Sequence, residues 1–306
     1  MSPTETDQSP PDPVGRASVG GPAVVAIGGG HGLAASLRAI RQFTDNITAV
    51  VSVADDGGSS GRLRDLYGVP APGDIRRCLL ALATVDQTVA DAFAHRFTQG
   101  ELAGHVAGNL MLTALTQSGA DFIEAIDRMG ELLAIQGRVL PNAVSAVRLT
   151  AKTAHGELTG QVAIKEAGEV HSISIDSPEV ECPPPVLQAV AEADSIIMGP
   201  GSLFTSVLAA LAVPELAEAV NAAVGERIYV CNLRPEPSET PEYDVARHVE
   251  ALHDHGVKID RVLYDPAEIQ AGELSISAQP APLAGVNGMV HDPSLLAAAL
   301  QHHQKH

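Results

Sequence analysis

The chain has 306 residues, of which 45% are apolar, and this is enough to form one large hydrophobic core or two modest ones. Its formal net charge of −18 argues against nucleic acid or an anionic membrane surface as a partner, because the long-range field repels both. The three cysteines show no paired spacing typical of a zinc ribbon, and no apolar segment reaches the length of a membrane span. We therefore expect a cytoplasmic protein that holds a small anion through local donors.

The predicted elements begin after a polar leader. Residues 1–21 are rich in Pro, Ser, Gly and acidic residues, so we expect them to be disordered, with a single α/β domain in residues 22–306. Residues 23–27 predict a buried strand, residues 33–41 show helical spacing, and residues 47–54 predict a second strand. This order is typical of a mostly parallel sheet in a doubly wound, Rossmann-like fold.

The middle of the chain predicts two additions to this sheet. Residues 55–64 are too polar and glycine-rich for a core and predict a loop. Residues 74–135 have mainly helical periodicity and form a helical insert, with Asp74 as the expected N-cap of its first helix. Residues 144–176 show alternation and predict a small antiparallel β extension, including a strand at 161–164.

The chain then returns to the sheet and repeats its opening arrangement. Residues 194–198 predict a buried strand, residues 199–202 form a second glycine turn, and residues 203–211 predict a helix. Further strands are expected at 227–231 and 261–264. Both glycine turns should lie at the carboxyl ends of parallel strands, where ligands bind in open α/β sheets.

The first glycine turn, residues 28–32, predicts an anion site. Glycine lets the backbone turn sharply and approach an anion closely, and the N–H groups that open the next helix hold the charge. The alternative is a tight turn alone, which does not need so many adjacent glycines. Gly28 and Gly30 fit the dinucleotide fingerprint, but Leu33 stands where its last glycine belongs, so a standard NAD site is disfavoured.

Charged residues near the carboxyl end of the second strand are further candidates. Asp55 and Asp56 have the hard oxygen ligands that suit Mg²⁺ or a ribose, and the alternative is an Asp–Gly turn that bonds its own backbone. Arg76 and its neighbours concentrate positive charge that can grip phosphate. The alternative for these arginines is pairing with Asp65 and Asp74 on exposed helix faces.

Three polar residues elsewhere complete the candidate set. Asn109 is the better ligand candidate at its helix start, whereas we expect a structural hydrogen bond from His105. Ser202 can cap the second helix and bind an anion with its N–H group. Asn232 follows a buried strand and can recognise a base or ribose, or can serve only as a turn residue. The spacing supports no Ser/His/Asp or Cys/His arrangement, so nucleophilic catalysis has no support.

Together these motifs resemble one family. The chain resembles the YvcK family of gluconeogenesis factors, relatives of CofD, the 2-phospho-L-lactate transferase of deazaflavin coenzyme synthesis. The resemblance runs from about Ala23 to Asn232, and the region after Asp265 matches poorly. It rests on the segments Gly28-Gly29-Gly30-His31-Gly32-Leu33, 53–63, Pro72-Gly73-Asp74-Ile75-Arg76, His105 with Gly108-Asn109, Gly199-Pro200-Gly201-Ser202-Leu203 and Cys231-Asn232. His31 stands where the family usually has Thr.

The resemblance implies a cytoplasmic protein that binds UDP-N-acetylglucosamine or UDP-glucose, with Mg²⁺ as an additional ion. It implies homo-oligomers and a role in cell shape and cell-wall synthesis during growth on gluconeogenic carbon sources. A regulator without turnover is preferred, because only 3% of residues are aromatic and few can stack on a deazaflavin; the alternative is a CofD-like phospholactyl transferase. The expected ligand-binding residues are Gly29, Gly30, His31, Gly32, Asp55, Asp56, Arg76, Asn109, Gly199, Gly201, Ser202 and Asn232, with Asp55 also as the expected metal ligand.

Overall fold

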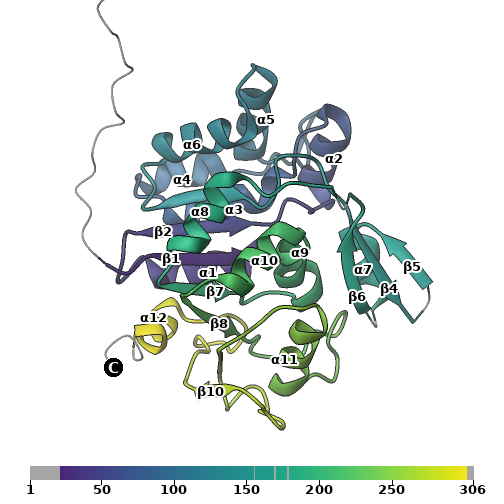
Figure 1. The fold of residues 1–306 in the computed structure, drawn as a ribbon. Coiled ribbons are helices and arrows are strands. Elements are labelled where there is room, and N and C mark those ends of the chain that lie inside the picture. Colours follow the sequence, from purple (N-terminus) through teal and green to yellow (C-terminus); the bar gives the residue numbers. More distant parts are fainter. Residues whose placement is uncertain (1–20, 155, 169, 178, 302–306) are drawn as a thin grey trace, which may run out of the picture.

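The computed structural model describes residues 21–154, 156–168, 170–177 and 179–301. Within these ranges, seven parallel strands form a sheet in the order β10–β9–β8–β7–β1–β2–β3. A smaller antiparallel sheet, ordered β5–β4–β6, lies to one side of it (Figure 1). The expected Rossmann-like α/β fold with an antiparallel extension is confirmed. The strands are β1 (Val24–Gly28), β2 (Ile47–Val51), β3 (Arg138–Pro141), β4 (Leu149–Thr153), β5 (Gly156–Thr159), β6 (Val170–Ile175), β7 (Ser195–Met198), β8 (Glu226–Val230), β9 (Arg261–Tyr264) and β10 (Ser277–Pro280).

The strand order of the large sheet reverses beside β1. After β1 the chain moves to β2 and then β3 on one side, while β7, β8, β9 and β10 follow in turn on the other side. The carboxyl ends of β1 and β7 therefore flank a topological switch point. Open α/β sheets bind ligands in the crevice at such a point.

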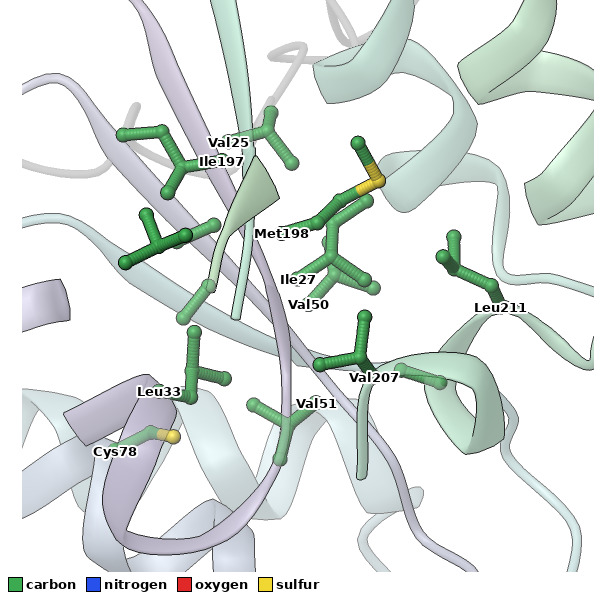
Figure 2. Packing of buried hydrophobic residues seen from close by; sticks show 14 of the residues in the cluster. Val25, Ile27, Leu33, Val50, Val51, Cys78, Ile197, Met198, Val207 and Leu211 are labelled. Atoms are coloured by element: carbon green, nitrogen blue, oxygen red, sulfur yellow. The ribbon is translucent and has the colours of Figure 1, made fainter. Parts of the chain in front are cut away.

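The core is centred on the middle strands of this sheet. Every residue of β1 is buried, as expected for a parallel strand covered on both faces. Figure 2 shows Ile27 and Val50 from neighbouring strands, with Val207 and Leu211 from the segment after the second glycine turn. The helices are α1 (Gly30–Ile40), α2 (Gly58–Tyr67), α3 (Pro72–Leu82), α4 (Gln87–Ala94), α5 (Ala107–Gln117), α6 (Phe122–Leu132), α7 (Gln161–Ala167), α8 (Pro184–Glu192), the π-helix η1 (Leu203–Leu208), α9 (Ala209–Leu211), α10 (Pro214–Ala222), α11 (Val245–Asp254) and α12 (Pro293–Gln301).

Two local predictions in polar segments are wrong. The predicted loop at 55–64 is a loop only at its start, because α2 begins at Gly58. The predicted strand at 161–164 is the first part of helix α7, and the strand of that region is β5, just before it. Only Ile164 of α7 is buried, so its short sequence carries no helical periodicity that could have been recognised.

Two strands of the large sheet, β3 and β10, were not predicted from the sequence. Strand β3 has four residues and ends in Pro141, so its apolar run is too short to show alternation. Strand β10 pairs with β9 alone, and none of its residues is buried, so it lacks the apolar pattern of a strand. Its edge position explains why it tolerates Pro280.

Most of the predicted leader, residues 1–20, lies outside the described residues, and its expected disorder stays a prediction. Helices α3 to α6 occupy the stretch predicted as a helical insert, while the division into domains also stays a prediction. In the part of the chain that the structure describes, no single helix is long and apolar enough to cross a membrane. Among the described residues, one pair of segments, Leu203–Leu211 and Pro214–Ala222, is long and apolar enough when taken together, but the two are bent by 81° relative to each other.

Candidate functional site

A cleft of about 370 Å³ opens at the switch point, beside the carboxyl ends of β1 and β7. Both glycine turns contribute to its wall, together with the loop after β2, the start of α3, helix α7 and the loop after β8. Segments far apart in sequence therefore meet at one site. The lining residues are Gly29, Gly30, His31, Gly32, Asp55, Asp74, Arg77, Gln161, Lys165, Gly201, Ser202, Thr205, Ser206 and Glu236.

The first glycine turn presents the N-terminus of α1 to the cleft. Gly29 is the N-cap, and Gly30 adopts a positive φ of 64°, which explains the glycine at that position. The N–H group of Gly30 donates to Asp74 Oδ2 at 2.6 Å. Among the described residues, the N–H groups of His31 and Gly32 have no hydrogen-bond acceptor, as is usual for the opening turn of a helix. These two donors are available to an anion in the cleft.

The two glycine turns pack directly against each other. A Cβ atom added to Gly32 would lie 2.1 Å from the carbonyl oxygen of Pro200, which no side chain tolerates. The N–H of Gly199 donates to the Ile27 carbonyl at 3.0 Å, and the Ser36 hydroxyl donates to the Gly199 carbonyl at 2.7 Å. The turns thus form one continuous wall, and Gly199 contributes to it through packing rather than by lining the cleft.

Side chains of the loop after β8 bond most of the second glycine turn and the start of η1, while the Ser202 N–H group has no acceptor among the described residues. The N–H of Gly201 donates to Asn232 Oδ1 at 3.0 Å, so Asn232 positions this turn and does not line the cleft. The buried Glu239 carboxylate accepts from the N–H groups of Phe204 at 3.0 Å and Thr205 at 3.2 Å. The predicted side-chain cap by Ser202 is wrong, because its hydroxyl donates to Glu236 Oε1 at 2.8 Å instead.

Asp74 is a cleft residue and not the predicted N-cap of α3. Ala71 occupies that cap, and Asp74 lies in the first turn of the helix, where it pairs with Arg77 and faces Gly30. Burial raises the pKa of the Asp74 carboxyl, the Arg77 charge opposes this shift, and nearby Asp55 adds to it. Burial and then the charge of Arg77 lower the pKa of His31, which favours its neutral form.

The two aspartates after β2 have different roles. Asp55 lines the cleft, and its Oδ1 also accepts from the Gly57 N–H at 2.9 Å, as in the Asp–Gly turn weighed for it. Asp56 lies outside the cleft lining, and its Oδ1 accepts from the Val162 N–H at 2.9 Å, in the first turn of α7. No group of three or more His, Cys, Asp or Glu side chains in the described ranges is arranged to hold a metal ion. The role of Asp55 as a metal ligand stays a prediction.

Arg76 and Asn109 belong to a buried network away from the cleft lining. Arg76 Nε donates to Asn109 Oδ1 at 3.0 Å, and Asn109 Nδ2 donates to the Ser59 hydroxyl at 3.2 Å. The Ser59 hydroxyl also lies 3.2 Å from His105 Nδ1, which matches the structural hydrogen bond expected of that histidine. Burial lowers the pKa of Arg76 to about 10. Arg76 and Asn109 therefore join helices α2, α3 and α5 behind the site.

Several cleft residues were missed by the sequence analysis. Lys165 and Gln161 belong to α7, whose helical nature was not recognised, and Gln161 Nε2 donates to the Thr205 carbonyl at 2.7 Å. Glu236 lies in a proline-rich loop, and its carboxylate is 3.8 Å from Lys165 Nζ. Only the fold brings these side chains to the glycine turns, so no local signal could have identified them.

The chain is similar to known proteins along most of its length. A family described as 2-phospho-L-lactate transferase CofD matches residues 24–300, so the similarity extends beyond Asn232 and past Asp265, where the sequence analysis expected a poor match. The gluconeogenesis factor of Bacillus subtilis is 43% identical over 237 residues, covering 76% of this chain and 75% of that protein. That of Listeria innocua is 40% identical over 253 residues, covering 81% and 79%. For a relative from Nostoc, 44% identical, the chain spans only 52% of the relative's length.

A solved structure is also similar along most of the chain. It is a member of the UPF0052 family from Bacillus halodurans, with 33% sequence identity and a TM-score of 0.86. The match covers 91% of this chain and 98% of that one. The fold around the cleft is therefore shared with this bacterial protein.

Proposed function

Because the chain belongs to the CofD family and is similar to bacterial gluconeogenesis factors, we propose that it binds a UDP-sugar in the cleft at the switch point. The ligand is UDP-N-acetylglucosamine or UDP-glucose. The proposal includes a cytoplasmic location, homo-oligomers and a role in cell shape and cell-wall synthesis on gluconeogenic carbon sources. The observation that carries it is the N-terminus of α1, where His31 and Gly32 line the cleft and their N–H groups have no acceptor among the described residues.

The lining suits a diphosphate joined to polar groups. The two free N–H groups and the α1 dipole favour the diphosphate, and Lys165 and Arg77 add positive charge. The Gln161 amide and the Ser206 hydroxyl can bond hydroxyls of a sugar or ribose, whereas the Thr205 hydroxyl already donates to the buried Glu239 carboxylate. Asp55, with Asp74 nearby, would hold Mg²⁺ against the phosphates, since this ion is bound by one or two carboxylates plus phosphate oxygens.

A CofD-like phospholactyl transfer is the second candidate, and the family description favours it. That reaction needs a deazaflavin acceptor, whose broad ring system is best held by aromatic stacking. The residues that line the described cleft include the His31 imidazole but no Phe, Tyr or Trp. We therefore favour binding without turnover.

Calorimetry tests both candidates. The purified chain is titrated with UDP-N-acetylglucosamine, UDP-glucose, NAD and GDP, each with and without Mg²⁺. We expect a UDP-sugar to bind more tightly than NAD or GDP. Tight binding of NAD or GDP with no response to either UDP-sugar would refute the proposal, and turnover of a deazaflavin acceptor would establish the transferase instead.

A genetic test addresses the cellular role. The wild-type chain and an Arg77→Gln variant are expressed in bacterial cells that lack their own gluconeogenesis factor. We expect the wild-type chain to restore normal shape on a gluconeogenic carbon source, and the variant to do so poorly. If a variant that no longer binds a UDP-sugar restores cell shape as well as wild type, the cellular role does not depend on ligand binding in the cleft.

A further inference from the structure

One carboxylate in the cleft faces the groups that an anionic ligand needs. Glu236 Oε1 accepts from the Ser202 hydroxyl at 2.8 Å and lies 3.8 Å from Lys165 Nζ. Its Oε2 is buried and has no hydrogen-bond partner among the described residues. A carboxylate with one orphaned oxygen is poorly satisfied, because buried acceptors without partners destabilise the folded state.

We propose that Glu236 is an internal competitor of the ligand, occupying the position where a phosphate of the ligand would meet Lys165 and Ser202. This inference rests on the proposed function, since it concerns the affinity of the same cleft for a phosphate-containing ligand. Binding then requires the Glu236 carboxylate to move aside or be neutralised. Glu236 thereby sets how strongly the cleft binds anions.

The charges around the cleft support this role. Its lining contains the carboxylates of Asp55, Asp74 and Glu236, but only two strong cations, Arg77 and Lys165. Arg77 is paired with Asp74, and Lys165 faces Glu236. An incoming phosphate therefore finds no unpaired cationic side chain in the described lining, and it meets additional negative charge. Neutralising Glu236 would free Lys165 and remove one repulsive charge at the same time.

The ion pair between Glu236 and Lys165 is suited to being broken. Its side chains are 30% and 49% exposed, and exposed pairs of this kind contribute little stability. A phosphate that makes closer contacts to Lys165 can therefore displace the Glu236 carboxylate with little loss of folding free energy.

The loop around Glu236 does not depend on the carboxylate. The backbone N–H of Glu236 donates to the Thr240 hydroxyl at 3.1 Å, and its carbonyl accepts from the N–H groups of Glu239 and Thr240 at 3.1 and 2.8 Å. Burial, together with the charge of Glu236, raises the pKa of Glu239, so these neighbouring carboxylates repel each other. A Glu236→Gln variant keeps the loop and relieves this repulsion, and we expect it to fold at least as stably as wild type.

The decisive measurement compares ligand affinity between matched variants. UDP-N-acetylglucosamine is titrated by calorimetry into wild type, Glu236→Gln and Glu242→Gln, where Glu242 is an exposed acid of the same loop. We expect Glu236→Gln to bind about tenfold more tightly, because a like charge is removed from beside the phosphate. Glu242→Gln should bind like wild type. Equal or weaker binding by Glu236→Gln would overturn the inference.

A second arm tests the route through Lys165. In a chain that already carries Lys165→Gln, the increase in ligand affinity caused by Glu236→Gln should be severalfold smaller, because the lysine that Glu236 would release is absent. An undiminished gain would overturn competition for Lys165. If neither wild type nor any variant binds a UDP-sugar, the proposed function fails, and inorganic pyrophosphate becomes the probe for the same variants. A tighter complex of pyrophosphate with Glu236→Gln would still support the competitor, and an unchanged one would refute it.

Discussion

The two glycine turns follow neighbouring strands and have similar sequences, but they differ in the hydrogen-bond partners of their backbone N–H groups. In the first turn, Gly30 donates its N–H group to Asp74, and among the described residues the N–H groups of His31 and Gly32 have no acceptor and remain available to a ligand. In the second turn, Asn232 accepts from the Gly201 N–H group and Glu236 accepts from the Ser202 hydroxyl, while the Ser202 N–H group has no acceptor among the described residues. Similar glycine-rich sequences have therefore produced one turn with two adjacent free N–H groups and one turn that side chains of the loop after β8 hold in place.

The difference arises from what packs over each turn. The loop after β8 brings Glu236 and Glu239 to the second turn and the start of η1, whereas the side chain that bonds the first turn is Asp74 from α3, itself paired with Arg77. A helix N-terminus attracts any carboxylate within reach, whether it belongs to a ligand or to the protein. The availability of a glycine turn thus depends on its neighbours in the fold.

The contact between the turns should give the largest effect when broken. We expect Gly32→Ala to lower the free energy of unfolding by about 3 kcal/mol, because its Cβ would overlap the Pro200 carbonyl. Gly58→Ala is the control, because Gly58 has a positive φ of 48° but no atom within 4 Å of its Cβ position. This variant should lose about 1 kcal/mol of unfolding free energy, from the backbone conformation alone. Urea unfolding measures both. Similar losses would mean that the turns are not in tight contact.

Removal of the internal carboxylate tests the second turn. Glu239→Ala leaves the buried N–H groups of Phe204 and Thr205 without their acceptor, and we expect a loss of about 2 kcal/mol. Glu239→Gln keeps an acceptor oxygen and should lose less. The comparison requires both variants in the same urea unfolding series. If alanine and glutamine are equally tolerated, Glu239 does not satisfy this turn.

Ligand affinity tests the functional difference between the turns. We expect Arg77→Gln, beside the first turn, to weaken UDP-sugar binding about tenfold, because a charged hydrogen-bond donor is lost from the cleft. Ser202→Ala, in the second turn, should change affinity by about twofold or less, because it removes a hydroxyl that bonds the competing Glu236 carboxylate in the free protein as well as the ligand phosphate in the complex. Arg38→Gln, an exposed arginine of α1, serves as control. The affinities are measured by calorimetry. A larger loss of affinity in Ser202→Ala than in Arg77→Gln would contradict the proposed difference between the two turns.

The smallest effect concerns pH. Burial raises the folded-state pKa of both Asp74 and Glu239, so each carboxyl binds its proton more tightly in the folded than in the unfolded chain. Each therefore adds stability as the pH falls through its raised pKa, and this gain is lost as the pH rises again. We expect the stability difference between wild type and Asp74→Asn or Glu239→Gln to change in this window, above about pH 4. Unfolding curves at several pH values check it, and parallel profiles would contradict it.

The parts of the fold with local signals were predictable. A few consecutive residues are enough to recognise the buried strand β1, the glycine turn after it and the strand at 261–264. The family resemblance drew on the same glycine-rich and acidic segments, and family membership is confirmed. Such features depend on backbone sterics and burial, which a short sequence window records.

The parts set by long-range contacts were not predictable. Whether Ser202 caps its helix depends on Glu236, 34 residues away, and whether Asp56 faces the cleft depends on α7, 106 residues away. Strand β10 exists because β9 offers it an edge, not because its own residues favour a strand. Both predicted glycine turns line the cleft at the switch point, whereas Gln161, Lys165 and Glu236 of its lining were not predicted. Which residues touch a ligand stays a prediction.

Helix α7 has only seven residues, and a helix this short is unstable in isolation. It is secured by Asp56, which accepts from its Val162 N–H, and by Gln161, which bonds the Thr205 carbonyl. Local unfolding of α7 would remove Lys165 from the cleft while the parallel sheet remains intact. The apparent dissociation constant of the ligand therefore includes the fraction of molecules in which α7 is docked, and a substitution at Asp56 would weaken binding without touching the ligand.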